Sequence, residues 1–151
     1  MKKLMTVLAA LVLLISASAF ATTDSPAVTE KVKVAFKKDF VKATGVSWTK
    51  KSEFYFAWFT INNVTVNAAY NEEGELVCIS RDMEMAQLPL NVSLVLSQKY
   101  ADYTLPETVT ELNLEGETHY YITISNEKQA LKLKFRPNGE VSIDQKIRIK
   151  K

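Results

Sequence analysis

The sequence predicts an α+β fold made of two tandem repeats, each an amphipathic helix followed by a four-stranded antiparallel sheet. Three observations lead to this prediction. A helical period of apolar residues occurs twice along the chain, and four short segments of alternating apolar and polar residues follow each time. In addition, the turn that contains Gly74 is matched by one that contains Gly139, 65 residues later. We place the two repeats at about residues 25–86 and 87–151.

The helices are predicted from apolar side chains at every fourth position, which lie on one side of an α-helix. In the first helix they are Val28, Val32, Phe36 and Phe40. Ser25 is expected to cap this helix and Pro26 to occupy its first position, because proline lacks the N–H that would be unpaired there. In the second helix, which has Pro89 in its first turn, they are Leu88, Val92, Leu96 and Tyr100. The second helix therefore resembles the first.

The strands are predicted from period-two alternation and from β-branched and aromatic residues. In the first half they cover residues 46–50, 54–61, 64–70 and 75–83, and in the second half residues 108–114, 119–125, 129–135 and 140–149. Asn62-Asn63 predicts a two-residue hairpin turn, because asparagine tolerates the positive φ that such turns need. This turn would pair Tyr55 with Tyr70, so that the hairpin presents an apolar face to the helix.

The first residues have the pattern of a cleavable secretory signal, which we place at residues 1–21. A lysine pair precedes an apolar run over residues 4–15, and a small-x-small motif ends at Ala21. The apolar run is too short to span a bilayer as a helix, which takes about 20 residues. We therefore expect residues 22–151 to form an exported domain in the periplasm or medium, without membrane insertion.

Cleavage after Ala21 would leave a domain with almost no net charge. The chain has 19 basic and 17 acidic residues, and the lysine pair of the signal would be lost without any acidic residue, so 17 of each sign would remain. Such a domain lacks the positive excess that binding to nucleic acid or anionic lipid requires. We expect no nucleic-acid partner.

Few residues in the exported part could carry enzyme chemistry. It has one histidine, His119, and one cysteine, Cys78, which is too few for a zinc site. Cys78 has apolar neighbours and matches Ile143 in the second half, so we expect it to be a buried packing residue. His119 is expected on the solvent side of a strand. The sequence therefore predicts no metal, no cofactor and no enzymatic activity.

Several short segments carry a family resemblance. They are Lys38-Asp39-Phe40, Val46-Ser47-Trp48, the turn at residues 71–76, Leu88-Pro89 and Lys99-Tyr100. With these segments the chain resembles the PepSY-like family of small periplasmic proteins, which is grouped with β-lactamase-inhibitor-like folds. The likeness covers nearly the whole exported part, although Ala101-Asp102-Tyr103 departs from the family's usual Pro-Gly-Tyr. It implies the fold and an envelope location, and it does not imply a ligand.

One sheet face carries the candidate binding residues. They are Phe54, Phe56, Trp58, Tyr121, Lys132 and Lys134. The three residues from the first half form an aromatic stripe on the side away from the helix, where an antiparallel sheet normally has polar residues. Either another part of this chain buries the stripe, or the stripe is an exposed patch that binds a partner.

The sequence therefore favours an exported, non-enzymatic binding or inhibitory module that presents the open face of its sheet to a protein or peptide partner. The alternative is a structural or self-assembling envelope protein, in which the stripe or an unpaired edge strand joins two copies as a homodimer. An enzyme ranks third among these possibilities, because no residues converge on a nucleophile, a base or a metal.

Overall fold

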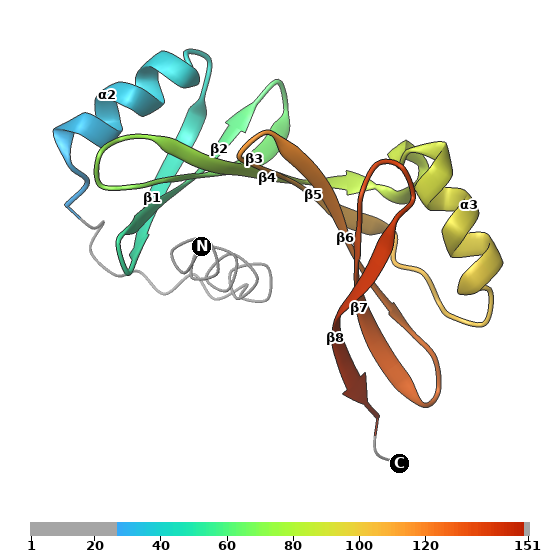
Figure 1. The fold of residues 1–151 in the computed structure, drawn as a ribbon. Helices are drawn as coiled ribbons and strands as arrows, with labels where there is room; N and C mark the ends of the chain where they lie inside the picture. The colour runs from blue at the N-terminus through green and yellow to red at the C-terminus, as the bar shows by residue number, and fades with distance from the viewer. Residues whose placement is uncertain (1–26, 150–151) are drawn as a thin grey trace.

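The computed structural model describes residues 27–149, which form one antiparallel sheet of eight strands with two helices packed on it (Figure 1). The strands follow one another in chain order from β1 to β8, so each strand pairs with its neighbours in the sequence. The prediction of two tandem repeats with separate four-stranded sheets is wrong. Strand β4 pairs with β5 and joins both halves in one continuous, mostly β, structure.

The elements agree with the predicted segments to within a few residues at each end. In chain order they are α2 (Glu30–Asp39), β1 (Thr44–Lys51), β2 (Phe54–Ile61), β3 (Val64–Tyr70), β4 (Leu76–Glu84), the 3₁₀ turn η1 (Met85–Gln87), α3 (Leu90–Lys99), β5 (Thr108–Leu114), β6 (Glu117–Ser125), β7 (Gln129–Phe135) and β8 (Val141–Arg148). The predicted signal at residues 1–21 lies outside the described residues.

The first helix begins later than predicted. Its N-cap is Thr29, whose hydroxyl oxygen accepts a hydrogen bond from the backbone N–H of Val32 at 3.4 Å. The prediction that Ser25 caps this helix is therefore wrong, because Thr29 satisfies one of the free N–H groups of the first turn. Ser25 and Pro26 themselves lie outside the described residues.

The predicted hairpin turn between β2 and β3 is confirmed. Asn62 and Asn63 have φ values of 51° and 63°, as a two-residue turn with the twist of the strands requires. The register that follows pairs Tyr55 with Tyr70, as predicted. The helix-facing side of this hairpin packs on α2, with Val32 and Phe36 among the buried residues of that cluster.

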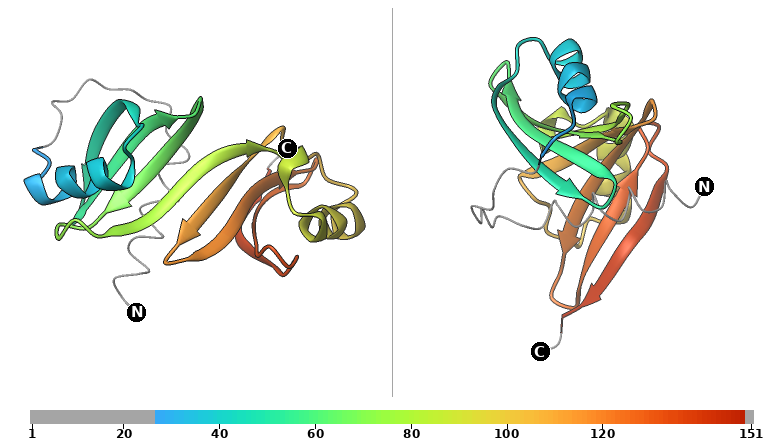
Figure 2. Two further views of the ribbon diagram at one scale, coloured as in Figure 1. Left: turned by 90° about the horizontal axis from the view of Figure 1, so that it is seen from above. Right: turned by 90° about the vertical axis from the view of Figure 1, so that its left-hand side faces the viewer.

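Both helices lie on the same face of the sheet. Ile79 and Met83 are four residues apart on β4, so their side chains point to the same side. Ile79 packs in the core cluster of α2, and Met83 packs in the core cluster of α3. The helices therefore cover opposite ends of one face, which we call the helix face (Figure 2).

Two glycines in turns allow the hairpins to approach the helices. A Cβ at Gly74, in the β3–β4 turn, would lie 3.0 Å from the backbone oxygen of Lys31 in α2. A Cβ at Gly139, in the β7–β8 turn, would lie 3.0 Å from the backbone oxygen of Asn91 in α3. Both glycines also have positive φ values, 82° and 90°. Each of these turns therefore lies in close contact with the backbone of one helix.

We predict that Gly74→Ala destabilises the protein more than Gly116→Ala does. Both positions have φ near 85°, which costs an alanine about 1–2 kcal/mol, but Gly116 has no atom within 4 Å of an added Cβ. The clash with Lys31 should therefore add at least about 1 kcal/mol at Gly74. Urea unfolding of the two variants measures the difference. Equal losses would show that the turn does not press on α2.

Candidate functional site

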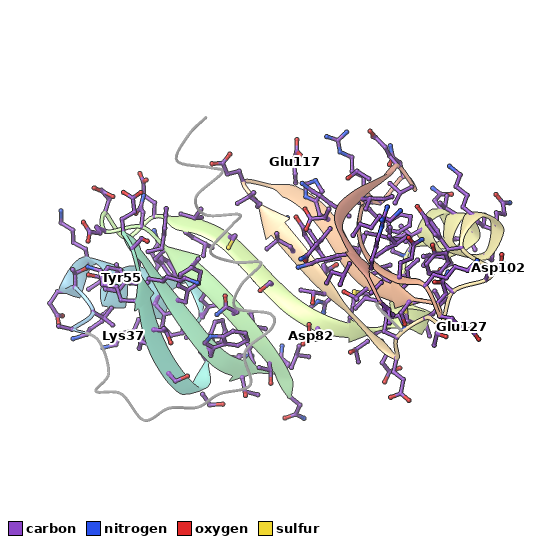
Figure 3. All side chains as sticks on the ribbon, turned by 90° about the horizontal axis from the view of Figure 1, so that it is seen from below. Lys37, Tyr55, Asp82, Asp102, Glu117 and Glu127 are labelled. Atoms are coloured by element: carbon purple, nitrogen blue, oxygen red, sulfur yellow. The ribbon has the colours of Figure 1, made fainter. Side chains whose placement is uncertain are left out.

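The face of the sheet away from α2 and α3, which we call the opposite face, has an apolar centre. Side chains from five strands pack on one another there and are buried, namely Phe54, Phe56, Ala69, Cys78, Leu112 and Tyr121. Phe56 has no exposed surface. We call this group the central cluster. Asp82 and Glu117, labelled in Figure 3, lie on the same face of β4 and β6.

A row of paired residues crosses this face from β1 to β6. In order they are Ser47, Trp58, Asn67, Ser80, Leu112 and His119, each paired with the next across neighbouring strands. Because strands lie about 4.8 Å apart, Trp58 and His119 are separated by roughly 19 Å along the row. Trp58 is partly exposed, whereas the members of the row that follow it from Asn67 to His119 are buried.

The buried Asn, Ser, Thr and His side chains of the described residues all lie on the opposite face. They are Asn67, Ser80, Thr110 and His119. The Asn67 amide donates to the backbone oxygen of Ala57 at 3.4 Å, and the Thr110 hydroxyl donates to the Asp82 carboxylate at 2.8 Å. The helix face, by contrast, is packed with apolar and aromatic residues. The two faces therefore differ in chemistry, and the two described helices pack on only one of them.

Two buried polar atoms on this face have no hydrogen-bond partner in the described part of the chain. They are Nδ1 of His119 and the hydroxyl oxygen of Tyr121. An unpaired buried donor or acceptor typically costs about 1–3 kcal/mol, and native proteins contain few of them. The two residues are neighbours on the same side of β6, about 7 Å apart along the strand. The fold does not explain them, which makes this end of the face a candidate site.

The ionisation of these groups follows from their burial. Burial raises the pKa of Tyr121 to about 12, and the Asp144 carboxylate adds to the shift, so the hydroxyl keeps its proton. Burial lowers the pKa of His119, and the cations of Lys134 and Arg136 act in the same direction while Glu117 opposes them. His119 is therefore a neutral imidazole at neutral pH, with one nitrogen donating and the other accepting.

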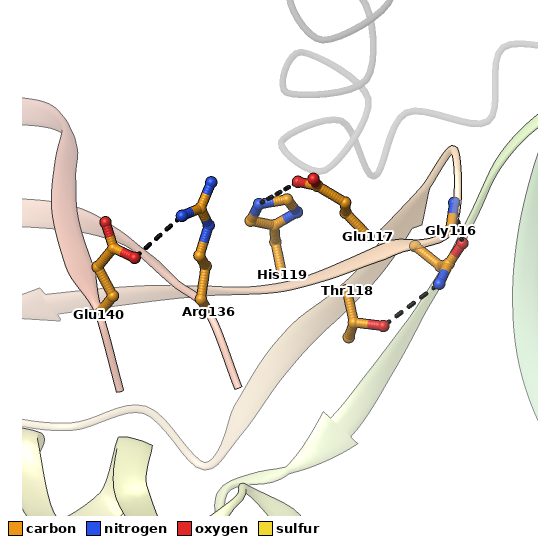
Figure 4. Close-up of polar contacts among 7 residues, drawn as sticks. Gly116, Glu117, Thr118, His119, Arg136 and Glu140 are labelled. Carbon is orange, nitrogen blue, oxygen red and sulfur yellow. Dashed lines mark hydrogen bonds and ion pairs between the residues drawn. The ribbon is translucent and has the colours of Figure 1, made fainter. Parts of the chain in front are cut away.

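The surroundings of His119 are charged (Figure 4). Its Nε2 lies 3.9 Å from the Glu117 carboxylate, too far for a hydrogen bond. In the turn that follows the neighbouring strand β7, Arg136 is held by Glu140 at 3.0 Å. The imidazole thus has charged neighbours on both sides and a free Nδ1.

Lys132 and Lys134 project from β7 beside Tyr121. Lys134 pairs directly with Tyr121 across the strands, and the Nζ of Lys132 lies 5.4 Å from the centre of the tyrosine ring. No acidic side chain within residues 27–149 comes within salt-bridge distance of either lysine. We call His119, Tyr121, Lys132 and Lys134 the polar end of the opposite face.

The structure places all six predicted binding residues on the opposite face, in two groups. Phe54, Phe56 and Tyr121 are buried in the central cluster, and Trp58 is partly exposed beside it. Lys132 and Lys134 belong to the polar end. For Phe54 and Phe56 the structure supports burial within this chain, the first of the two alternatives. The binding role of the six residues stays a prediction.

The sequence analysis missed the position of His119. We expected a solvent-facing histidine, and the structure buries it to 5% exposure. Alternation along β6 did place His119 and Tyr121 on one face, but only the pairing of β5 with β6, which sets His119 against Leu112, shows that this face is buried. Knowledge of which strands flank β6 would have been needed to predict it.

Cys78 is buried, as predicted, but its match to Ile143 does not hold in space. Cys78 pairs with Ala69 on the opposite face, whereas Ile143 pairs with Leu133 on the helix face and is 54% exposed. The register shifts beside Ala69 in one half and beside Leu133 in the other. Because a β-bulge moves the residues beyond it to the other face, equal spacing in the sequence gives unlike positions.

Two searches for particular sites concern the described residues alone. Within residues 27–149 no group of three or more His, Cys, Asp or Glu side chains is placed to hold a metal ion. Neither described helix is long and apolar enough to cross a membrane. What the face offers chemically is one partly exposed tryptophan, two buried hydrogen-bonding atoms without partners and two lysines outside any ion pair of the described residues.

Comparisons with known proteins show the fold. No protein-family model and no curated protein matches the chain. A DUF2874 family protein from Bacteroides ovatus is similar over 83% of this chain and 89% of its own, with a TM-score of 0.69 and 24% identity. A protein from Bacteroides eggerthii described as periplasmic matches over 81% and 89%, with a TM-score of 0.69 and 21% identity.

A BLIP-like protein from Bacteroides fragilis is similar over 80% of this chain and 86% of its own, with a TM-score of 0.67 and 17% identity. At these identities the likeness concerns the fold alone. The chain therefore has a BLIP-like fold, and the resemblance to the PepSY-like family stays a prediction.

We predict that Cys78 does not react with a bulky thiol reagent in the native protein. Burial raises the pKa of this thiol to about 12, so the reactive thiolate is scarce at pH 8. Cys78→Ser should lower the free energy of unfolding by about 1 kcal/mol, because a hydroxyl would be buried in the central cluster. Labelling at pH 8 with and without urea checks this. Fast labelling without urea would contradict the burial.

Proposed function

We propose that this chain is an exported, non-enzymatic binding module that uses the opposite face of its sheet to hold a protein or peptide partner in the periplasm. The observation that carries the proposal is the chemistry of that face. It holds all the buried Asn, Ser, Thr and His side chains of the described residues and both unpartnered polar atoms, and a partly exposed tryptophan lies farther along the same face. Interfaces combine such aromatic anchors with polar groups that a partner can satisfy.

Two further observations support the proposed export and periplasmic location. The residues before the described part have the pattern of a secretory signal. One of the solved structures with the same fold is a protein described as periplasmic. The proposed cleavage near Ala21 would release the domain from this signal.

Self-assembly is the second candidate, because β1 and β8 are edge strands with exposed side chains. Edge strands can pair with other chains unless charges prevent it. Lys50 and Lys51 lie on β1, and Lys146 and Arg148 lie on β8. Lysine and arginine side chains on edge strands oppose edge-to-edge pairing, so we expect pairing between copies to be disfavoured. Light scattering after size-exclusion chromatography should show a monomer at all concentrations, and a concentration-dependent dimer would favour self-assembly.

We predict that Trp58→Thr abolishes capture of the partner and leaves the fold intact. Trp58 is partly exposed, and threonine suits a strand, so the free energy of unfolding should fall by less than about 1 kcal/mol. An aromatic anchor typically contributes about 2 kcal/mol or more to binding. Immobilised residues 22–151 with and without the substitution, exposed to periplasmic extract of the source bacterium, measure the capture.

The matched control for this assay is Ile143→Thr. Ile143 is also an exposed apolar strand residue, but it lies on the helix face at the edge of the sheet. A partner retained by the wild type and by Ile143→Thr, and lost with Trp58→Thr, supports the proposal. Equal retention by all three proteins, or retention of no protein at all, contradicts it.

A further inference from the structure

We propose that the polar end of the opposite face binds carboxylate side chains of an acidic peptide segment in the partner, through Tyr121, His119 and the two lysines of β7. This inference deepens the proposed function, because it names the chemistry that one end of the face recognises. It stands on the two unpartnered buried atoms and on the cations beside them.

The hydrogen-bonding groups fit a carboxylate. The Tyr121 hydroxyl keeps its proton and can donate it, and no oxygen or nitrogen of the described residues receives it. The Nδ1 of His119 can donate in the tautomer or charge state that carries a proton there. Carboxylate oxygens accept two hydrogen bonds each, so an acidic side chain could satisfy a donor and still face a cation.

The charges around the site also favour an anion. Lys132 and Lys134 have no acidic partner within salt-bridge distance in the described part of the chain, although Asp144 lies near Lys132 and Tyr121. The Asp82 carboxylate on the same face already accepts the Thr110 hydroxyl. The Glu117 carboxylate lies 3.9 Å from Nε2 of His119 and is not within salt-bridge distance of either lysine, so Lys132 and Lys134 have no contacting carboxylate among the described residues.

We expect a partner to reach the buried atoms through side-chain movement alone. Lys132 and Lys134 are only partly buried, and they have long flexible stems beside Tyr121. Side-chain rotamer changes of this kind are common when interfaces form. On binding, the lysine side chains would turn outward and form ion pairs with the carboxylates of the peptide. The Tyr121 hydroxyl would then be accessible to donate a hydrogen bond to a carboxylate.

The test uses His119, the only histidine of the chain, as the reporter. Its pKa is measured by NMR in residues 22–151 with and without tetraglutamate, acetylated and amidated so that only side-chain carboxylates are present. A bound carboxylate stabilises the protonated imidazole and should raise the pKa by at least one unit. Tetraglutamine should leave it unchanged. No shift with saturating tetraglutamate would overturn the proposal, and so would tighter binding of inorganic phosphate at the same ionic strength.

Variants separate a specific site from general attraction between charges. Lys134→Gln should weaken tetraglutamate binding at least fivefold, whereas Lys146→Gln, which removes the same charge from the helix-face side of β8, should change it less than twofold. Equal effects of the two variants would mean unspecific attraction and would refute the site.

Tyr121→Phe gives a readout that a merely structural role would not produce. Loss of an unpartnered buried hydroxyl should leave the unfolding midpoint unchanged or raise it. The same change should weaken tetraglutamate binding at least fivefold. A lower midpoint, or unaltered binding, would count against the proposal. If the acidic peptide fails while the Trp58-dependent partner is still captured, the inference falls and the proposed function stands.

Discussion

The pairing of β4 with β5 is the constraint on which the rest of this structure depends. Seven residue pairs, from Cys78 with Leu114 to Glu84 with Thr108, join the two halves. The pairing encloses η1 and α3 in the connection between these strands, and α3 packs on the side where α2 lies. It places Ser80 beside Leu112 and so completes the row from Trp58 to His119. The opposite face exists as one surface only because of this junction.

The two faces of the sheet divide stability and recognition between them. The helix face is closed by aromatic and aliphatic packing, such as the contact of Phe36 with Phe59, and Tyr70 ties the sheet to the end of α2 by donating to Asp39 at 2.9 Å. The opposite face carries the buried polar groups, among them the two unpartnered atoms of His119 and Tyr121, which cost stability. Sites that give up stability in this way are often functional.

Most elements of the fold could be predicted from the sequence, but their assembly could not. Period-four and period-two patterns located both helices and all eight strands, and Asn62-Asn63 fixed one register, because these signals are local. The pairing of β4 with β5 links strands on either side of a helix, and alternation does not identify such partners. The position of a β-bulge cannot be predicted from alternation either. The match of Cys78 to Ile143 by spacing in the sequence therefore gave the wrong spatial equivalence. For the site, the face was predictable, and the burial of His119 was not.

Native-state hydrogen exchange tests the central claim, that one continuous sheet carries the opposite face across both halves. Amides of β4 and β5 should exchange only through global unfolding, with the same opening free energy as amides of β2 and β6, because the junction makes the halves one cooperative unit. Unprotected amides at the junction, or a β5–β8 half that opens at a much lower free energy than the β1–β4 half, would show that the halves are separate. The opposite face would then not be a single surface.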